Sequence, residues 1–272
     1  MYLIDVGSML GVKVKKNKKA RGVMFVIIIT FLIFGCMSIK THKGYTVEKN
    51  HSRKTVDKKY LIGVDNFVYL IKKHTLQLDC EIIENDTLCT PMLASTASGF
   101  VFSSDNNTVF VLTAAHFCKK DMIPGVDEEI IGIAKDLERP LTVLTMDEAA
   151  DICLLMGVKY EHESFHQIEL SQKEPDLGSD VYTVAGPNGI GGPGFRPVFV
   201  GKFAGCDEKN CMTTLPATFG SSGAGIYTKD GKLITIVMAV TEGFENLVLS
   251  PSQKDIHKFI FTIDNMIDIY QY

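Results

Sequence analysis

The sequence lacks several features that would point directly to a common functional class. It has no excess of basic charge, because the 272 residues carry a formal net charge of −4. The overall charge signature of a nucleic-acid-binding protein is therefore absent. There is no internal repeat, and low complexity is confined to one short polar stretch. What remains is a chain with 46% apolar residues, enough to bury one sizeable core or two small ones.

Charge is missing altogether from one long stretch near the start. The eighteen residues 22–39 are uncharged, and they follow six basic residues that lie between Lys13 and Arg21. A basic segment followed by an apolar one is typical of an export signal. The run ends in "LIFGC", which resembles the bacterial lipobox and predicts cleavage before Cys36 and lipidation of that residue. Two alternatives stay open: an uncleaved anchor, since eighteen residues is near the lower limit for crossing about 30 Å of hydrocarbon, and plain secretion.

The rest of the chain divides by composition. Residues 40–59, "KTHKGYTVEKNHSRKTVDKK", are polar and lack apolar periodicity, so we expect a tether between residues 1–39, the signal or anchor, and a folded domain over 60–272. Within that domain, short runs such as "NTVFVLTAA", "DICLLMGV" and "DVYTVAG" alternate with Gly, Pro, Asn and Asp. This spacing predicts an all-β fold. Asp230-Gly231, between two apolar runs, predicts a hairpin with a type I′ turn.

Helical periodicity is likewise scarce, and only the C-terminus has a long stretch of it. In "SPSQKDIHKFIFTIDNMIDIY", Ser250 is the expected N-cap, Pro251 the first helical residue and Gln253 the partner in a capping box. One face of this helix should pack against the β-structure; it carries Ile256, Phe259, Ile260, Ile263 and Ile267.

Seven cysteines are consistent with export without establishing it. Two pairs are close in sequence, Cys80 with Cys89 and Cys206 with Cys211, and both spacings suit a disulfide across a hairpin or tight loop in an oxidising compartment. Cys118 and Cys153 are expected to be a third pair or two buried thiols. The apolar run around Cys153 favours buried thiols.

Three short motifs supply the groups that acyl transfer by a serine requires. A hydroxyl is a weak nucleophile, so it needs a histidine to take its proton, a carboxylate to orient the histidine, and donors for the developing oxyanion. "VLTAAHFC" places His116 at the end of an apolar run, and "EAADICLLM" places Asp151 at the start of another. "TFGSSGAGIY" places two serines, Ser221 and Ser222, between glycines.

In this order the motifs resemble those of trypsin-like peptidases with the chymotrypsin fold, most similar to the HtrA-type and other bacterial or viral branches. The family's T-A-A-H is matched by residues 113–116, its D-I-x-L-L by 151–155, and its G-x-S-G-G by 220–224, with Ala224 in place of the last glycine. "SGFVF", "VAGPNGIGG", "GKLITIVMAV" and "VLSPS" are supporting matches, and the likeness covers about residues 61–260. It implies two six-stranded antiparallel β-barrels and a C-terminal α-helix.

The resemblance also assigns roles. Gly220 stands two residues before Ser222, which makes Ser222 the nucleophile, with its own N–H and that of Gly220 forming the oxyanion hole. Ser221 is then a turn serine that bonds nearby backbone. The implied substrate pocket contains no carboxylate to hold Lys or Arg and no histidine to hold Glu, so we expect a small or medium apolar side chain there. Its residues would be Pro216, Ala217, Thr218, Met238, Ala239 and Val240.

Competing residues are less well placed for this chemistry. Asp147 and Glu148 are near Asp151, but only Asp151 is followed directly by an apolar run. His162 and His166 lie in a polar segment and read as solvated; their spacing could suit a metal on a helix, but no third ligand is apparent. We therefore expect neither metal nor cofactor.

The leading hypothesis is an exported, membrane-tethered serine endopeptidase that cleaves proteins or peptides through an acyl-enzyme. The alternative is a catalytically inactive binding protein with the same fold, suggested by the unusual Ser221 and Ala224. In a third reading, the oxyanion loop opens only when substrate or a partner orders it.

Overall fold

A computed structural model describes residues 57–76, 80–83, 86–89, 92–120, 126–191, 194–241 and 243–270. All of them belong to one compact unit, residues 55–272. The expected signal with Cys36, and the tether as far as residue 56, lie outside the described residues. Among the residues described, no helix has the length and apolar character needed to cross a membrane.

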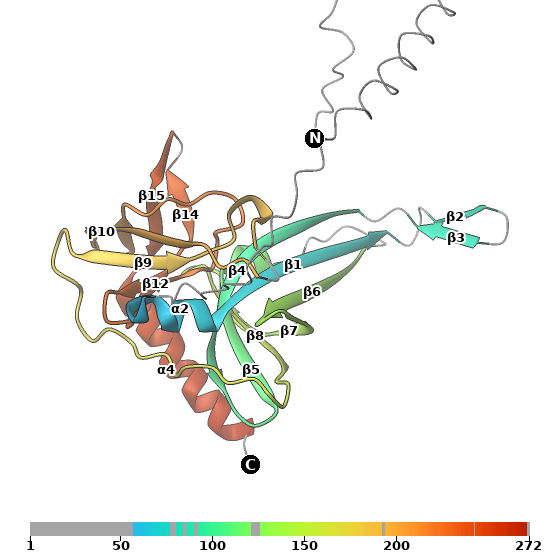
Figure 1. The fold of residues 1–272 in the computed structure, drawn as a ribbon, viewed down its shortest axis with the longest axis horizontal. Coiled ribbons are helices and arrows are strands. Elements are labelled where there is room, and N and C mark those ends of the chain that lie inside the picture. Colours follow the sequence, from blue (N-terminus) through green and yellow to red (C-terminus); the bar gives the residue numbers. More distant parts are fainter. Residues whose placement is uncertain are drawn as a thin grey trace, which may run out of the picture. The chain divides into compact units, whose positions relative to one another are not determined.

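Residues 67–158, the first lobe, form a closed antiparallel barrel with the strand order β1-β4-β5-β8-β7-β6 (Figure 1). Along β1, Val68 and Leu70 lie in this lobe's own core, whereas Phe67 and Tyr69 belong to a cluster shared with the second lobe. This alternation is the two-residue period of a strand. The strands are β1 (Phe67–Leu76), β4 (Met92–Ser104), β5 (Thr108–Thr113), β6 (Val126–Ala134), β7 (Leu137–Asp147) and β8 (Ile152–Val158).

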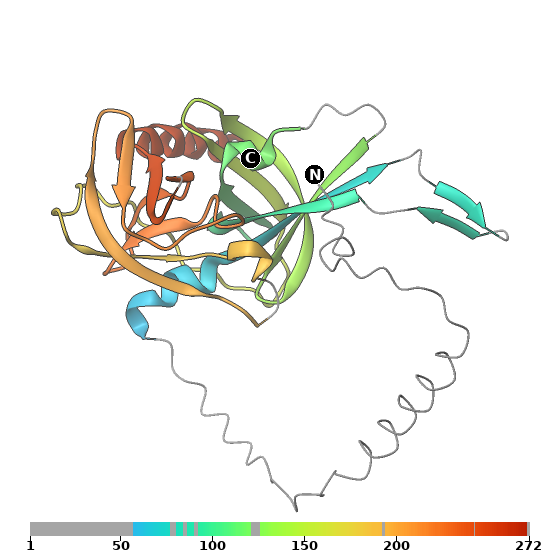
Figure 2. The ribbon, with the colours of Figure 1, turned by 90° about the horizontal axis from the view of Figure 1, so that it is seen from above.

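Residues 180–251, the second lobe, form a seven-stranded antiparallel sheet in the order β13-β12-β9-β10-β11-β15-β14. The fold class predicted from the sequence is confirmed, although this lobe has one strand more than the six expected, counted over the described residues. Figure 2 shows the two lobes side by side, the first in cyan and green and the second in yellow to orange. The strands are β9 (Asp180–Val184), β10 (Val198–Cys206), β11 (Asn210–Thr213), β12 (Gly225–Thr228), β13 (Leu233–Ile236), β14 (Ala239–Thr241) and β15 (Phe244–Pro251).

The hairpin predicted at Asp230-Gly231 joins β12 to β13, and Gly231 has a φ of +87°. Its loop covers residues 229–232, so the expected two-residue type I′ turn is wrong; Gly231 N–H instead closes a turn on the Thr228 carbonyl (2.9 Å). The runs of apolar residues did not predict β1 or β6. The remaining short elements are η3 (Lys58–Tyr60), α2 (Leu61–Asn66), β2 (Cys80–Ile83), β3 (Asp86–Cys89), α3 (Ala115–Cys118) and η4 (Pro187–Gly189).

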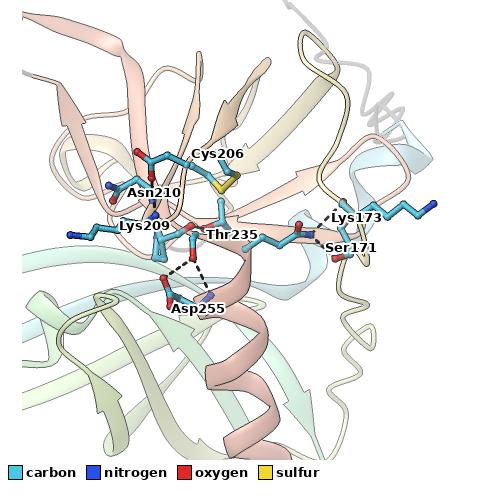
Figure 3. Close-up of a disulfide and its surroundings, with 12 residues drawn as sticks. Ser171, Lys173, Cys206, Lys209, Asn210, Thr235 and Asp255 are labelled. Atoms are coloured by element: carbon cyan, nitrogen blue, oxygen red, sulfur yellow. Dashed lines mark hydrogen bonds between the residues drawn. A yellow bond between two sulfur atoms is a disulfide. The ribbon is translucent and has the colours of Figure 1, made fainter.

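The C-terminal helix α4 (Gln253–Tyr270) begins later than predicted (Figure 3). Ser252, not Ser250, is the N-cap: its Oγ accepts from Asp255 N–H (3.2 Å) and donates to the Asp255 carboxylate (2.6 Å). Ser250 and Pro251 are unavailable because they pair with β11 as the end of β15. The predicted apolar face is buried at Ile256, Phe259, Ile260 and Ile263, and the side chain of Ile267 lies outside the described part.

Side-chain bonds join the segment between the lobes, residues 159–179, to the first lobe. Arg139 of β7 forms a two-point ion pair with Glu163, and both side chains are almost completely buried. Asn66 donates to the carbonyls of Val101 (2.6 Å) and His166 (2.7 Å). Removal of one partner from a buried ion pair strongly destabilises a protein, because the other charge is left buried and unpaired. These bonds therefore hold the connecting segment in one position.

The cysteines differ in part from expectation. Cys118 and Cys153 form a disulfide rather than the buried thiols that the apolar run favoured. The spacing rule missed it because β5 pairs with β8, which brings residues 35 apart in sequence together. The Cys206–Cys211 disulfide joins β10 to β11 (Figure 3). Cys80 and Cys89 are opposite each other in the backbone register of the β2–β3 hairpin. Their side chains lie outside the described part, so the predicted disulfide stays a prediction.

Candidate active site

His116 lies on α3, the single helical turn that follows β5. The turn starts because Thr113 ends the strand and Ala114 has extended backbone angles before the helix. Ala115 N–H then donates to the Asp151 carbonyl (3.1 Å). About half of the His116 side chain is exposed. The residue is therefore held through the backbone of its turn, while its imidazole ring is open to solvent.

Asp151 ends the turn before β8 and is the residue that orients this imidazole. Its φ of +54° is in the left-handed region, which Asp tolerates better than most residues. One carboxylate oxygen accepts from His116 N–H (2.7 Å), and the other lies 2.8 Å from His116 Nδ1. Because a carboxylate only accepts, the ring proton belongs on Nδ1, and Nε2 is the nitrogen left to bind another proton.

The neighbouring carboxylates have other partners. Asp147 Oδ1 accepts from Ala149 and Ala150 N–H and so stabilises the turn that leads to Asp151. Glu148 bonds Lys119 (2.8 Å), and this hydrogen bond raises the pKa of the lysine. The residue that contacts His116 is therefore the one selected from the sequence.

The Cys118–Cys153 disulfide covalently links the segments that carry His116 and Asp151. Cys118 is two residues after His116 and Cys153 is two residues after Asp151, and both sulfurs belong to almost fully buried residues. The helical turn that carries the histidine is thus joined directly to the strand that follows the aspartate.

Ser222 lies in the loop between Thr218 and β12, opposite this pair. Its carbonyl accepts from Ser98 N–H (2.9 Å) of the first lobe. The next residue, Gly223, has a φ of +84°, and a Cβ there would overlap Thr113 Oγ1 and the Ser98 carbonyl. Only glycine can therefore bring the loop this close to the first lobe.

Ser222 and His116 line one cleft of about 420 Å³, together with Lys72, Ser95, Thr96, Ala97, Phe117, Phe219 and Gly220. In the part of the chain that the structure describes, Ser222 Oγ and His116 Nε2 form no hydrogen bond. Ser221 is buried instead, and its Oγ accepts from Thr218 N–H (3.3 Å). The two serines therefore differ as expected: one faces the cleft and the other bonds the backbone of its turn.

The peptide group before Gly220 has a defined orientation. Its carbonyl, that of Phe219, accepts from Asn188 N–H (2.6 Å), and in a trans peptide the N–H of Gly220 points the opposite way. Within the described residues, the N–H groups of Gly220 and Ser222 donate to no protein acceptor. Both residues line the cleft, so two backbone donors are available there.

The central part of the sequence shows which family the chain belongs to. A family model for the trypsin-like peptidase domain matches residues 97–236, which is half of the chain and includes His116, Asp151 and Ser222. The chain belongs to the trypsin-like peptidases. No curated protein matches the sequence.

Solved structures of proteases share the fold at low sequence identity. The Rv3671c protease from M. tuberculosis in its active form is 16% identical, with a TM-score of 0.54 over 74% of this chain and 82% of that one. The HtrA-type protease AlgW with a tripeptide is 17% identical, with a TM-score of 0.56 over 75% of this chain and 62% of that one. A serine endoprotease from Yersinia pestis is 17% identical, with a TM-score of 0.54 over 75% and 64% of the respective chains.

Ala224, the departure from the motif of the trypsin-like peptidases, fits its position. Its φ is not positive, so no glycine is needed there, and its methyl group is fully buried in the second lobe's core. Its N–H donates to the Ser221 carbonyl (3.1 Å), and its carbonyl accepts from Val237 N–H (2.8 Å). The alanine therefore does not distort the loop.

A hollow of about 160 Å³ lies beside this loop in the trypsin-like domain. Three of the predicted pocket residues line it, Pro216, Ala217 and Thr218, whereas Met238, Ala239 and Val240 do not. Its other lining residues are Pro187, Phe199 and Asn246, which sequence reasoning missed because they come from three distant segments. No local pattern marks them.

The other histidines are used elsewhere. His166 Nε2 is 2.9 Å from Asp65, His257 Nε2 is 2.9 Å from the Ser171 carbonyl, and His74 lies 3.4 Å from Glu128. His162 is exposed. Across the described ranges, no group of three or more His, Cys, Asp or Glu side chains is arranged to hold a metal ion.

Proposed function

We propose that this trypsin-like peptidase is a serine endopeptidase that hydrolyses peptide bonds of protein or peptide substrates through an acyl-enzyme. The observation that carries the proposal is that His116 and Ser222 line one cleft, while the Asp151 carboxylate lies 2.8 Å from Nδ1 of the same imidazole. These residues come from two lobes and three separate segments, and such an arrangement is recognised by geometry and role rather than by position in the chain.

In the proposed reaction, His116 Nε2 takes the proton of Ser222 as its oxygen attacks the substrate carbonyl carbon. The tetrahedral oxyanion is bound by the N–H groups of Gly220 and Ser222. His116 then gives the proton to the leaving amine, and a water molecule, activated in the same way, releases the acid product. Asp151 holds the Nδ1–H tautomer and stabilises the imidazolium. The hydrogen bond between Ser222 and His116 forms as substrate closes the site, as is common for unliganded enzymes.

The hollow beside the loop is the proposed pocket for the side chain that precedes the cut. Its volume of about 160 Å³ suits a small or medium residue, and no charged side chain lines it. Pro187, Phe199 and Pro216 supply apolar surface, and Asn246 supplies a neutral polar group. We expect apolar side chains to be preferred there over Lys, Arg or Glu.

A fluorophosphonate probe tests the activity without knowledge of the natural substrate. It should label the purified protein once, and a peptide map should place the adduct on Ser222. Ser222→Ala should abolish labelling, and Ser221→Ala, the matched control on the neighbouring hydroxyl, should retain it. Absence of labelling in the folded wild-type protein, or equal labelling of Ser222→Ala, would instead support a binding protein with a peptidase fold.

The proposed setting is extracytoplasmic, with residues 1–39 as signal or anchor, 40–59 as tether and 60–272 as the peptidase domain. Two disulfides in the domain favour an oxidising compartment. Mass spectrometry of the mature protein tests this: an acylated Cys36 at the N-terminus supports the lipoprotein, and an intact residue 1 supports an uncleaved anchor.

A further inference from the structure

One fully buried hydroxyl joins the first lobe to the loop that carries Ser222. Ser98, on β4, has no exposed surface. Its Oγ donates a hydrogen bond to the Gly220 carbonyl (2.7 Å) and accepts one from Gly186 N–H (2.9 Å). Both partners belong to the second lobe, and they lie 34 residues apart in the sequence. A single oxygen therefore connects two loops of the second lobe, which the hydrogen bond from Asn188 N–H to the Phe219 carbonyl (2.6 Å) also joins.

The backbone of Ser98 is engaged at the same place. Its N–H donates to the Ser222 carbonyl (2.9 Å), and its carbonyl accepts from Thr113 Oγ1 (2.8 Å). Thr113 ends the strand that leads to His116. Ser98 is thus bonded to the serine loop through both its main chain and its side chain, while its own position is set by the strand that carries the histidine.

These bonds determine the orientation of both peptide groups around Gly220. The group before it is held by the Phe219 carbonyl on Asn188 N–H (2.6 Å). The group after it is held on one side by the bond from Ser98 Oγ and on the other by Ser221 N–H, which donates to the Thr218 carbonyl (2.9 Å). With both planes held, Gly220 cannot rotate its N–H without breaking a hydrogen bond.

The contact is too close for any other residue at position 220. The φ of Gly220 is +87°, and a Cβ built there would lie 2.5 Å from the Gly186 carbonyl oxygen. Gly186 N–H is the group that donates to Ser98 Oγ. The hydroxyl therefore bonds to both of two backbone segments that pass too close to each other for a side chain at position 220.

We propose that Ser98 is a positioning residue for oxyanion binding: its hydroxyl holds the Gly220 carbonyl and Gly186 N–H so that Gly220 N–H faces the cleft. The inference rests on the proposed peptidase activity. Ser98 does not line the cleft and does not touch the reacting atoms, so it acts through Gly220. Without its hydroxyl, a buried carbonyl and a buried N–H lose their partner, and rotation of the peptide groups around Gly220 becomes the means to regain one.

The rate of fluorophosphonate labelling tests the proposal, because the phosphoryl oxygen of the adduct occupies the place of the substrate oxyanion. Ser98→Ala should lower the maximal labelling rate of the folded protein by about 10- to 100-fold, less than the roughly 100- to 1,000-fold loss of one oxyanion donor, because Gly220 N–H is misoriented rather than removed. The apparent affinity of the probe and the pH midpoint of labelling should stay the same, since the pocket and the His116–Asp151 pair are unchanged.

Thr235→Val is the matched control. Thr235 is fully buried, and its Oγ1 donates to the Pro251 carbonyl (2.7 Å) away from the cleft, so this change also removes one buried hydroxyl bond. It should lower the melting temperature while the labelling rate per folded molecule stays within about twofold. Ser98→Cys, which keeps a side chain of similar size with a weak donor and acceptor, should lie between wild type and Ser98→Ala.

The outcomes separate this inference from the proposed function. If the wild-type protein is not labelled at all, the proposed function fails. If it is labelled, and folded Ser98→Ala and Ser98→Cys are labelled at the wild-type rate, the proposed role of Ser98 is wrong and the activity stands. A loss of rate per folded molecule equal to that of Thr235→Val would also overturn it. Should Ser98→Ala not fold, Ser98→Cys decides.

Discussion

The two halves of the candidate site are held by different kinds of bond. His116 and Asp151 both belong to the first lobe, and side-chain hydrogen bonds and the Cys118–Cys153 disulfide join their segments. Ser222 belongs to the second lobe, and its loop is held by glycine geometry and by hydrogen bonds to main-chain groups, two of which come from Ser98 of the other lobe.

The difference shows which half depends on the lobes being packed together. His116 and Asp151 can keep their geometry within a single barrel, because the hydrogen bonds and the disulfide that join their segments all lie inside it. The serine loop depends in addition on the other lobe, since it is bonded to Ser98 of β4 and packs closely against Thr113 of β5. Substitutions on the two sides should therefore fail in different ways.

The largest effect on the first side is expected from Asp151→Asn. The amide preserves size but removes the charge that orients the Nδ1–H tautomer, so the labelling rate should fall by about 10⁴-fold with little change in unfolding temperature. Asp147→Asn is the control, because Asp147 stabilises the adjoining turn without contacting His116. An Asp151→Asn variant that is labelled within tenfold of wild type would contradict the assigned role.

On the second side, Gly223→Ala should combine loss of activity with loss of stability. The new Cβ would overlap Thr113 Oγ1 and the Ser98 carbonyl, and a φ of +84° is costly for alanine. We expect labelling to fall by at least about 100-fold and thermal unfolding to occur at lower temperature. The reverse change next to it, Ala224→Gly, should cost about 1 kcal/mol and keep labelling within a few-fold. Equal behaviour of the two variants would show that the loop is not held as described.

Removal of the disulfide should change activity least. Cys118→Ala/Cys153→Ala opens a link between residues 35 apart, which corresponds to about 3–4 kcal/mol of stability by loop entropy. Because the hydrogen bonds between Asp151 and His116 remain, the labelling rate of the folded fraction should fall by less than about tenfold. Urea titration and labelling below the transition measure the two quantities.

The matched control is Cys206→Ala/Cys211→Ala, which opens a link between residues 5 apart in the second lobe. The same relation gives about 2 kcal/mol, and no effect on labelling is expected. If Cys206→Ala/Cys211→Ala lost more stability than Cys118→Ala/Cys153→Ala, the order expected from loop length would be wrong, and a loss of labelling in it would contradict the separation of this disulfide from the site.

Much of the fold follows from local patterns. The strands around His116, Asp151 and Ser222 were predicted because runs of β-branched residues end at turn residues, and the apolar face of α4 follows the helical period. The start of α4 was placed two residues early because Ser250 and Ser252 offer the same capping chemistry. Only the pairing of Ser250 with Cys211 across two strands distinguishes them.

The three residues proposed for catalysis could be selected from the sequence because each has a local signature: a strand that ends in a histidine, an aspartate before an apolar strand, and a serine between glycines. The sequence matched Gly223 to a family motif, but only the structure shows why glycine is needed there: its φ is +84°, and a Cβ would overlap Thr113 Oγ1 and the Ser98 carbonyl. The tertiary structure alone decided the Cys118–Cys153 bond, the pocket residues Phe199 and Asn246, and the bridge made by Ser98. These depend on pairings between distant segments. The residues next to a serine or a cysteine in the sequence do not show which partner folding will bring to its hydroxyl or thiol.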